Sequence, residues 1–179
     1  MPPRTEPRVT PRADAAIDGA ARFDFFFYGT LCDADVRKVV FDRAVEAVPA
    51  VLADHEAVPV ARGRYPMLAF QRGCRASGVL CRGLSLTEAA RLSFYEHEGR
   101  DYGVRRFRVN ADGAAHEAWV YVPLAALRRG MGRWDLAEWQ RFAKRDFLAR
   151  VIRAMRNVEA KELEPFVALW RGRAAPVRG

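Results

Sequence analysis

The feature that most constrains the fold is an aromatic, apolar segment at residues 22–28, with the sequence Arg-Phe-Asp-Phe-Phe-Phe-Tyr. Aromatic residues are enriched in strands, and a run this apolar needs cover on both faces, so it predicts a strand at the centre of the fold. The strand ends at residues 29–31, Gly-Thr-Leu, which we expect to form a turn. A short helix over residues 33–44 should follow, because its valines recur at helical spacing and Asp33 can cap its start.

Proline and glycine divide the next part of the chain into short apolar segments. Each segment predicts a strand, and these four strands fall at residues 44–52, 57–62, 67–70 and 76–84. Two further strands are expected at residues 104–110 and 117–122, because the sequence Ala-Asp-Gly between them suits a hairpin turn.

Three helices are expected besides the short one. Ser85 and Glu88 have the spacing of a capping box, which predicts a helix from there to about Glu96. A long helix should begin at Asp135, since apolar residues keep helical spacing from there to Met155. A short helix is expected near the C-terminus. Strands with a few helices, without strict strand–helix alternation, favour the α+β class.

The chain has 179 residues, which is the size of one domain. We place this domain at residues 22–170. Residues 1–21 are rich in proline, arginine and alanine and lack aromatic residues, so we expect a disordered N-terminal tail. Residues 171–179 are expected to form a loose C-terminal tail.

The sequence carries no sign of membrane insertion or export. No stretch approaches the roughly 18 uncharged apolar residues of a membrane-spanning helix, and the N-terminus lacks the charged-then-apolar order of a signal peptide. The three cysteines do not describe a disulfide framework, and the three histidines show no ligand spacing. We therefore expect a cytoplasmic protein that binds no metal and contacts no membrane.

The loop after the first strand carries the most informative motif. An apolar strand running directly into Tyr28, Gly29, Thr30 and Leu31 resembles the opening signature of the gamma-glutamylcyclotransferase-like superfamily, in its bacterial-type, avirulence-induced-gene-like branch. Similar segments follow in the family's order, at residues 64–66, 78–80, 83–85, 92–96 and 119–122. The resemblance covers about residues 23–123, and the order and spacing of its motifs together make it specific.

The resemblance implies a fold and a reaction. The fold would be a small, distorted, mixed β-barrel with flanking helices and a long C-terminal helix. Its cavity would be lined by the loop at residues 28–31 and by Tyr102, with one glutamate projecting inward. In the reaction, the α-amine of a γ-glutamyl group attacks its own γ-carbonyl and releases 5-oxoproline. The resemblance implies a small γ-glutamyl substrate and no metal or organic cofactor.

One carboxyl group could perform the proton transfers of this reaction. The attacking amine arrives as an ammonium and must lose a proton, and the leaving nitrogen must later gain one. A glutamate at a helix end among aromatic residues can have its pKa raised by burial toward neutral pH. Successive backbone N–H groups in a glycine-containing turn could stabilise the negative oxygen of the intermediate.

Two glutamates compete for the role of this acid. The segment departs from the family pattern, because Ser93 stands where aspartate is usual and His97 where glycine is usual. Alignment on Leu92 selects Glu96, whereas alignment on Gly99 selects Glu98. We favour Glu96, because the capping box fixes the register of the helix that precedes it. Elsewhere, Tyr65 and Tyr121 are expected to be structural.

Other functions stay open from the sequence alone. A non-catalytic member of the same fold could use the cavity to bind a small molecule. The net charge of +8 also allows an arginine-rich surface that binds nucleic acid, although no recognition motif supports one. The motifs do not distinguish an amino acid, an amine or glutathione as the source of the leaving group. The long helix could cover the barrel or form a homodimer contact.

Overall fold

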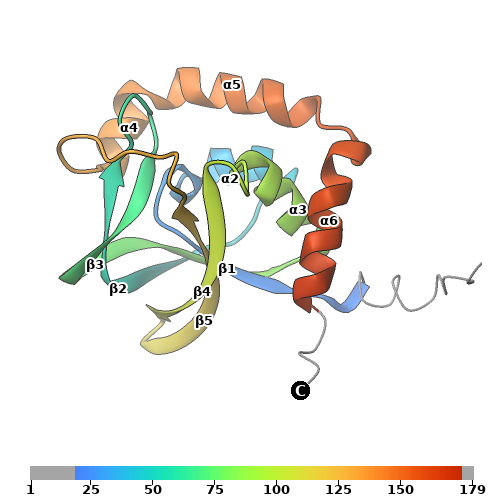
Figure 1. Ribbon diagram of the computed structural model, residues 1–179, viewed down its shortest axis with the longest axis horizontal. Coiled ribbons are helices and arrows are strands. Elements are labelled where there is room, and N and C mark those ends of the chain that lie inside the picture. The colour runs from blue at the N-terminus through green and yellow to red at the C-terminus, as the bar shows by residue number, and fades with distance from the viewer. Residues whose placement is uncertain (1–18, 175–179) are drawn as a thin grey trace, which may run out of the picture.

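Five strands close into a small barrel, and helices cover one side of it (Figure 1). The structure is a computed structural model that describes residues 19–174. Most of the predicted N-terminal tail and the last five residues of the predicted C-terminal tail lie outside these residues. The strands are β1 (Phe23–Phe27), β2 (Val48–Pro59), β3 (Pro66–Leu84), β4 (Tyr102–Ala111) and β5 (Ala114–Pro123).

The barrel is mixed because one of its seams is parallel. Its strands follow the order β1-β3-β2-β4-β5, and the barrel closes where β1 runs parallel to β5, with Phe25 opposite Trp119. The other neighbouring strands pair antiparallel. The α+β class and the small mixed barrel predicted from the sequence are confirmed.

The four short strands predicted after the first helix are wrong, because the structure has two long ones. β2 and β3 pair from Val48 opposite Leu80 to Pro59 opposite Pro66. The prolines lie at the ends of this ladder, where a missing N–H costs least. The pairing of the two strands shifts register once, between Ala53 and His55. The Gly73 N–H donates to the Asp54 carboxylate there, at 2.8 Å. The prolines and the glycine that predicted loops therefore lie at strand ends and at a local distortion of the β2–β3 ladder.

The hairpin between β4 and β5 forms as predicted. Its ladder extends from Tyr102 opposite Pro123 to Ala111 opposite Ala114. Asp112 and Gly113 make the turn, with φ of 52° and 75°. Positive φ at both central residues matches the right-handed twist of the flanking strands, which explains the Asp-Gly sequence.

The helices are η1 (Thr30–Cys32), α2 (Ala34–Phe41), α3 (Leu86–Tyr95), α4 (Leu136–Phe142), α5 (Lys144–Arg156) and α6 (Ala160–Ala174). Asp33 caps α2, and both hydrogen bonds of the capping box predicted at the start of α3 are present. The long helix predicted from Asp135 is interrupted at Ala143, whose φ of −122° is not helical. α6 extends to Ala174, so it includes the first residues predicted to be a loose tail. No helix within residues 19–174 is long and apolar enough to cross a membrane.

The core has two parts, which explains the aromatic run of β1. Side chains alternate between the faces of a strand. Phe26 therefore packs inside the barrel with residues such as Leu80 and Val120. Phe25 and Phe27 belong to the layer between the barrel and the helices. Trp170 of α6 is fully buried in this second layer.

Candidate active site

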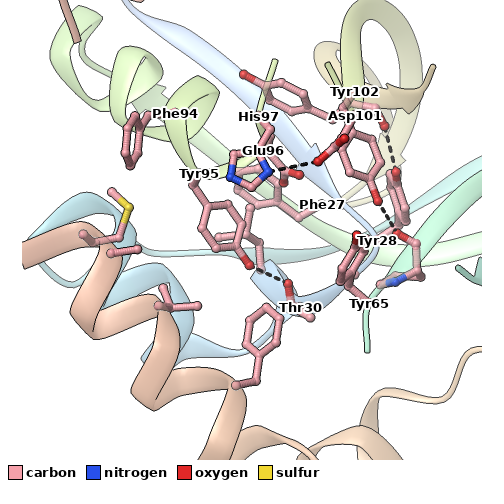
Figure 2. A pocket seen from close by; sticks show the side chains of 18 of the residues that line it. Phe27, Tyr28, Thr30, Tyr65, Phe94, Tyr95, Glu96, His97, Asp101 and Tyr102 are labelled. Atoms are coloured by element: carbon pink, nitrogen blue, oxygen red, sulfur yellow. Dashed lines mark hydrogen bonds and ion pairs between the residues drawn. The ribbon is translucent and has the colours of Figure 1, made fainter. Parts of the chain in front are cut away.

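A cavity of about 300 Å³ lies between the barrel and the helices (Figure 2). Its walls come from the loop after β1, the end of α3, the start of β4 and one face of α5. All five tyrosines of the chain line it, and they are Tyr28, Tyr65, Tyr95, Tyr102 and Tyr121. Burial raises the pKa of every one of these phenols, so each stays protonated at neutral pH and can donate a hydrogen bond.

The loop at residues 28–31 forms one wall of the cavity. The Tyr28 hydroxyl donates to the carbonyl of Tyr121 at 2.8 Å. A hydrogen bond of 2.8 Å joins the hydroxyls of Thr30 and Tyr95 (Figure 2). Gly29 precedes the 3-10 helix η1, in which the first backbone N–H groups have no partner within the helix. Leu31 is buried and also lines the cavity.

Gly29 occurs where the loop passes close to the start of β3. A Cβ atom on Gly29 would lie 2.7 Å from Pro66 Cγ. The substitution Gly29→Ala should therefore push the Pro66 ring aside and lower the free energy of unfolding by about 1–3 kcal/mol. Chemical denaturation measures this loss. Gly172→Ala is the matched control, because a Cβ there meets nothing within 4 Å and should be neutral or slightly stabilising. Equal stability of both variants would contradict the close packing.

Glu96 lies at the C-terminal end of α3, with its half-buried side chain in the cavity (Figure 2). Within residues 19–174 no hydrogen bond or ion pair reaches its carboxyl group. Burial raises the pKa of this carboxyl to about 8. A carboxyl group with a pKa near neutral, surrounded by aromatic side chains and without a counter-ion, is suited to transfer protons.

Glu98 lies outside the cavity lining, in a buried network. Its Oε2 accepts a hydrogen bond from Ser93 Oγ at 2.6 Å, and its Oε1 pairs with the Arg173 guanidinium of α6 at 2.5 Å. The Trp170 indole N–H donates to the same Ser93 hydroxyl at 2.7 Å. The side chain of Glu98 is only 6% exposed. Its oxygens are therefore occupied by protein partners, unlike those of Glu96.

The two departures from the family pattern each have a local explanation. His97 has a φ of 49°, in the left-handed region that glycine adopts most easily. A hydrogen bond of 3.0 Å between its ring Nδ1 and the Asp101 carboxylate fixes the side chain in this turn. Ser93 is fully buried, and the Glu98 carboxylate lies against its hydroxyl. A carboxylate is thus present beside position 93, although it comes from another residue.

Several lining residues were not predicted. Tyr65 and Tyr121 were expected to be structural, yet both line the cavity. Tyr102, a predicted site residue, also lines it and donates its hydroxyl to the carbonyl of Pro66 at 2.8 Å. The wall from α5 was missed as well, although its helical spacing is visible in the sequence. Within residues 19–174, no three His, Cys, Asp or Glu side chains gather as metal ligands would.

Sequence comparison gives this chain a family match. The family model described as "Gamma-glutamyl cyclotransferase, AIG2-like" matches residues 25–141. The chain is 29% identical to the Arabidopsis thaliana protein AIG2 C over 119 residues, which are 64% of this chain and 70% of that protein. It is 24% identical to the Arabidopsis thaliana AIG2-like protein C over 144 residues, which are 79% of this chain and 83% of that protein.

Solved structures show the same fold. A solution structure of an Arabidopsis thaliana protein aligns with a TM-score of 0.56 at 24% identity, covering 75% of this chain and 91% of that one. A structure titled gamma-glutamyl cyclotransferase aligns with a TM-score of 0.50 at 12% identity, covering 83% of this chain and 99% of that one. At these identities the alignments support the fold alone.

Proposed function

The chain belongs to the AIG2-like gamma-glutamyl cyclotransferase family, and from this premise we propose that it is a cyclotransferase that releases 5-oxoproline from γ-glutamyl compounds with Glu96 as its acid and base. The observation that carries the proposal is the state of the Glu96 carboxyl. It lies in the cavity beside the loop at residues 28–31, it has no protein partner within residues 19–174, and burial raises its pKa to about 8.

The ionised Glu96 carboxylate would first accept a proton from the substrate's α-ammonium. The freed amine then attacks the γ-carbonyl carbon, and a carbon–nitrogen bond closes the five-membered ring. The carbonyl oxygen becomes negative in the intermediate. As this intermediate collapses, protonated Glu96 gives its proton to the leaving nitrogen and the bond to that nitrogen breaks. The ring nitrogen passes its remaining extra proton to the released amine, which leaves as an ammonium. One carboxyl group thus serves as base and then as acid, and it ends in its starting state.

The loop at residues 28–31 is suited to bind the negative oxygen. The first N–H groups of η1 have no partner within that helix, so they can donate to an oxyanion. The hydroxyls of Tyr28 and Tyr102 are already donated to the carbonyls of Tyr121 and Pro66. These two side chains would therefore fix the shape of the cavity rather than exchange protons. Holding both ends of the glutamyl group in one cavity favours ring closure further.

Activity is expected to depend on pH through Glu96. Its folded pKa of about 8 means that the carboxylate form becomes scarcer as pH falls. Below pH 8, kcat/KM should fall about tenfold per pH unit, because this ratio reports the ionisation of the free enzyme. The measurement is kcat/KM from 5-oxoproline release between pH 5 and pH 9. A rate that stays constant down to pH 5 would mean that a carboxyl of ordinary pKa is the base.

The direct test is chromatographic detection of 5-oxoproline after incubation with a panel of γ-glutamyl amino acids, γ-glutamyl amines and glutathione. Turnover of at least one compound, at a rate proportional to enzyme concentration, supports the proposal. If every compound is left intact while one of them binds the cavity, the protein is a small-molecule binder of the same fold and the enzymatic proposal fails.

A further inference from the structure

One wall of the cavity comes from a helix beyond the region that matches the family model. The match ends at residue 141, and α5 (Lys144–Arg156) follows it. Five residues of α5 line the cavity, and they are Phe147, Arg150, Val151, Ala154 and Met155. Their spacing of three and four residues places them on one face of the helix. This wall therefore lies outside the part of the chain that the family model matches.

Arg150 is the one charged residue on this face of α5. The other charged groups at the cavity besides Glu96 satisfy one another. The Asp101 carboxylate pairs with the His97 ring at 3.0 Å and with the Arg100 guanidinium at 2.9 Å. Within the described residues, no carboxylate forms an ion pair with Arg150. Its guanidinium lies 5.7 Å from the centre of the Phe147 ring, which lines the same cavity.

Arg150 and Glu96 lie in different parts of the cavity. Arg150 is exposed, which places it at the cavity mouth, whereas Glu96 is half-buried. Burial alone raises the pKa of Glu96, and no cation contributes to it. A guanidinium close to that carboxyl would lower its pKa instead. A substrate whose α-amine reaches Glu96 therefore still has its far end free to meet Arg150.

The far end of a γ-glutamyl substrate is its leaving group. In the proposed reaction, the α-amine and the γ-carbonyl would both lie near Glu96, so the substituent on the leaving nitrogen is the part of the substrate that can reach the mouth. An arginine with no carboxylate partner among the described residues is a strong binding partner for a carboxylate in that substituent, since its planar fork can donate two parallel hydrogen bonds.

We propose that Arg150 makes this cavity selective for γ-glutamyl compounds whose leaving group carries a carboxylate, as in γ-glutamyl amino acids, over compounds whose leaving group is an uncharged alkylamine. The proposal rests on the proposed function for the placement of the glutamyl group. It identifies Arg150 as a residue that contacts the substrate and determines specificity without taking part in proton transfer.

The test compares two ligands that differ in one carboxylate, γ-glutamyl-alanine and γ-glutamyl-ethylamide. Binding of each is measured by calorimetry in the Glu96→Gln background, in which neither compound should be consumed. The parent should bind γ-glutamyl-alanine about 10–100-fold more tightly, the range expected for a charge-assisted hydrogen bond. Adding Arg150→Gln should remove this preference by weakening only γ-glutamyl-alanine. Adding Arg153→Gln is the matched control, because it removes the same charge from an exposed position on α5 that does not line the cavity.

Three results would overturn the proposal. The first is equal affinity of the parent for the two compounds, and the second is failure of both to bind. The third is an equal loss of affinity for both compounds on Arg150→Gln, which would assign Arg150 to the glutamyl α-carboxylate that they share. The proposed function is judged separately, from 5-oxoproline release by the wild type. A binding preference without release would retain the role of Arg150 as a ligand selector and reject the enzymatic reaction.

Discussion

Replacing Glu96 with glutamine is expected to lower the rate of 5-oxoproline release by about 10²–10⁴-fold, the range that a positioned acid–base group contributes. Glutamine has nearly the same shape but can neither accept the ammonium proton nor return it to the leaving nitrogen. Binding should persist, so the loss should appear in kcat more than in KM. The measurement is steady-state 5-oxoproline release with a γ-glutamyl amino acid.

Glu98→Gln is the control for this prediction, because it changes the other candidate acid in the same way. It removes the charge that pairs with Arg173 inside a buried network, so it should lower the midpoint of thermal unfolding. The folded fraction should still turn substrate over, because Glu98 does not line the cavity. An inactive but folded Glu98→Gln variant beside an active Glu96→Gln variant would show that Glu98 is the acid.

Glu96→Gln should also change stability, in a direction that depends on pH. The folded pKa of about 8 lies above the ordinary glutamate pKa of 4.5, so the folded chain holds a proton that the unfolded chain releases between these values. The stability of the wild type should therefore fall as pH rises from about 4.5 to 8. Glutamine never ionises, so the variant should be more stable than the wild type above pH 8, on the order of 1–3 kcal/mol. Denaturation at pH 5 and pH 9 separates this effect from a general change in packing.

Replacing Trp170 with alanine is expected to destabilise the fold by about 3–5 kcal/mol, as for other large aromatic residues truncated in a core. Trp170 is fully buried, and its ring packs edge-on against Phe23, Phe25 and Trp119 at 4.9–5.3 Å between centroids. Its indole N–H is also a hydrogen-bond donor to Ser93. The measurement is the free energy of unfolding from chemical denaturation.

Trp170→Phe separates packing from hydrogen bonding. It keeps most of the aromatic contact but removes the donor to Ser93, so its cost should be clearly smaller than that of the alanine variant. Trp170→Ala should also reduce turnover in the folded protein. Loss of the tryptophan loosens α6, whose Arg173 holds Glu98 two residues after Glu96. An unchanged unfolding free energy in Trp170→Ala would show that α6 does not contribute to the fold.

Short sequence patterns predicted the elements whose structure depends mainly on residues that are close together in the sequence. The aromatic run predicted β1, the capping box predicted the start of α3, and the Asp-Gly turn predicted the hairpin of β4 and β5. The same kind of reasoning failed for β2 and β3. Gly73 suggested a loop in the sequence, but in the structure it lies within the single strand β3, where the ladder with β2 shifts register. Only pairing with the partner strand distinguishes these two cases.

The sequence predicted residues of the candidate site only where a single short segment determines their position. The loop at residues 28–31 and Glu96 could be located because a strand end and a helix register fix them. Tyr65, Tyr121 and the α5 wall reach the cavity through barrel closure and helix docking, which local patterns do not encode. Glu98 shows the same limit, because its partner Arg173 lies in a segment that was predicted to be loose.

The parallel seam between β1 and β5 has a consequence for how the chain folds as it is synthesised. β1 is synthesised first. Its Phe25 pairs with Trp119 of β5, which is synthesised only after most of the barrel sequence. At translation rates of roughly 5–20 residues per second, about 5–20 s pass before the two strands can meet. During that interval the most aromatic strand of the protein lacks a neighbour on one edge and is exposed to aggregation. Contacts this distant in sequence also slow refolding. Barrel closure should therefore be the late, chaperone-sensitive step that completes the fold around the loop at residues 28–31.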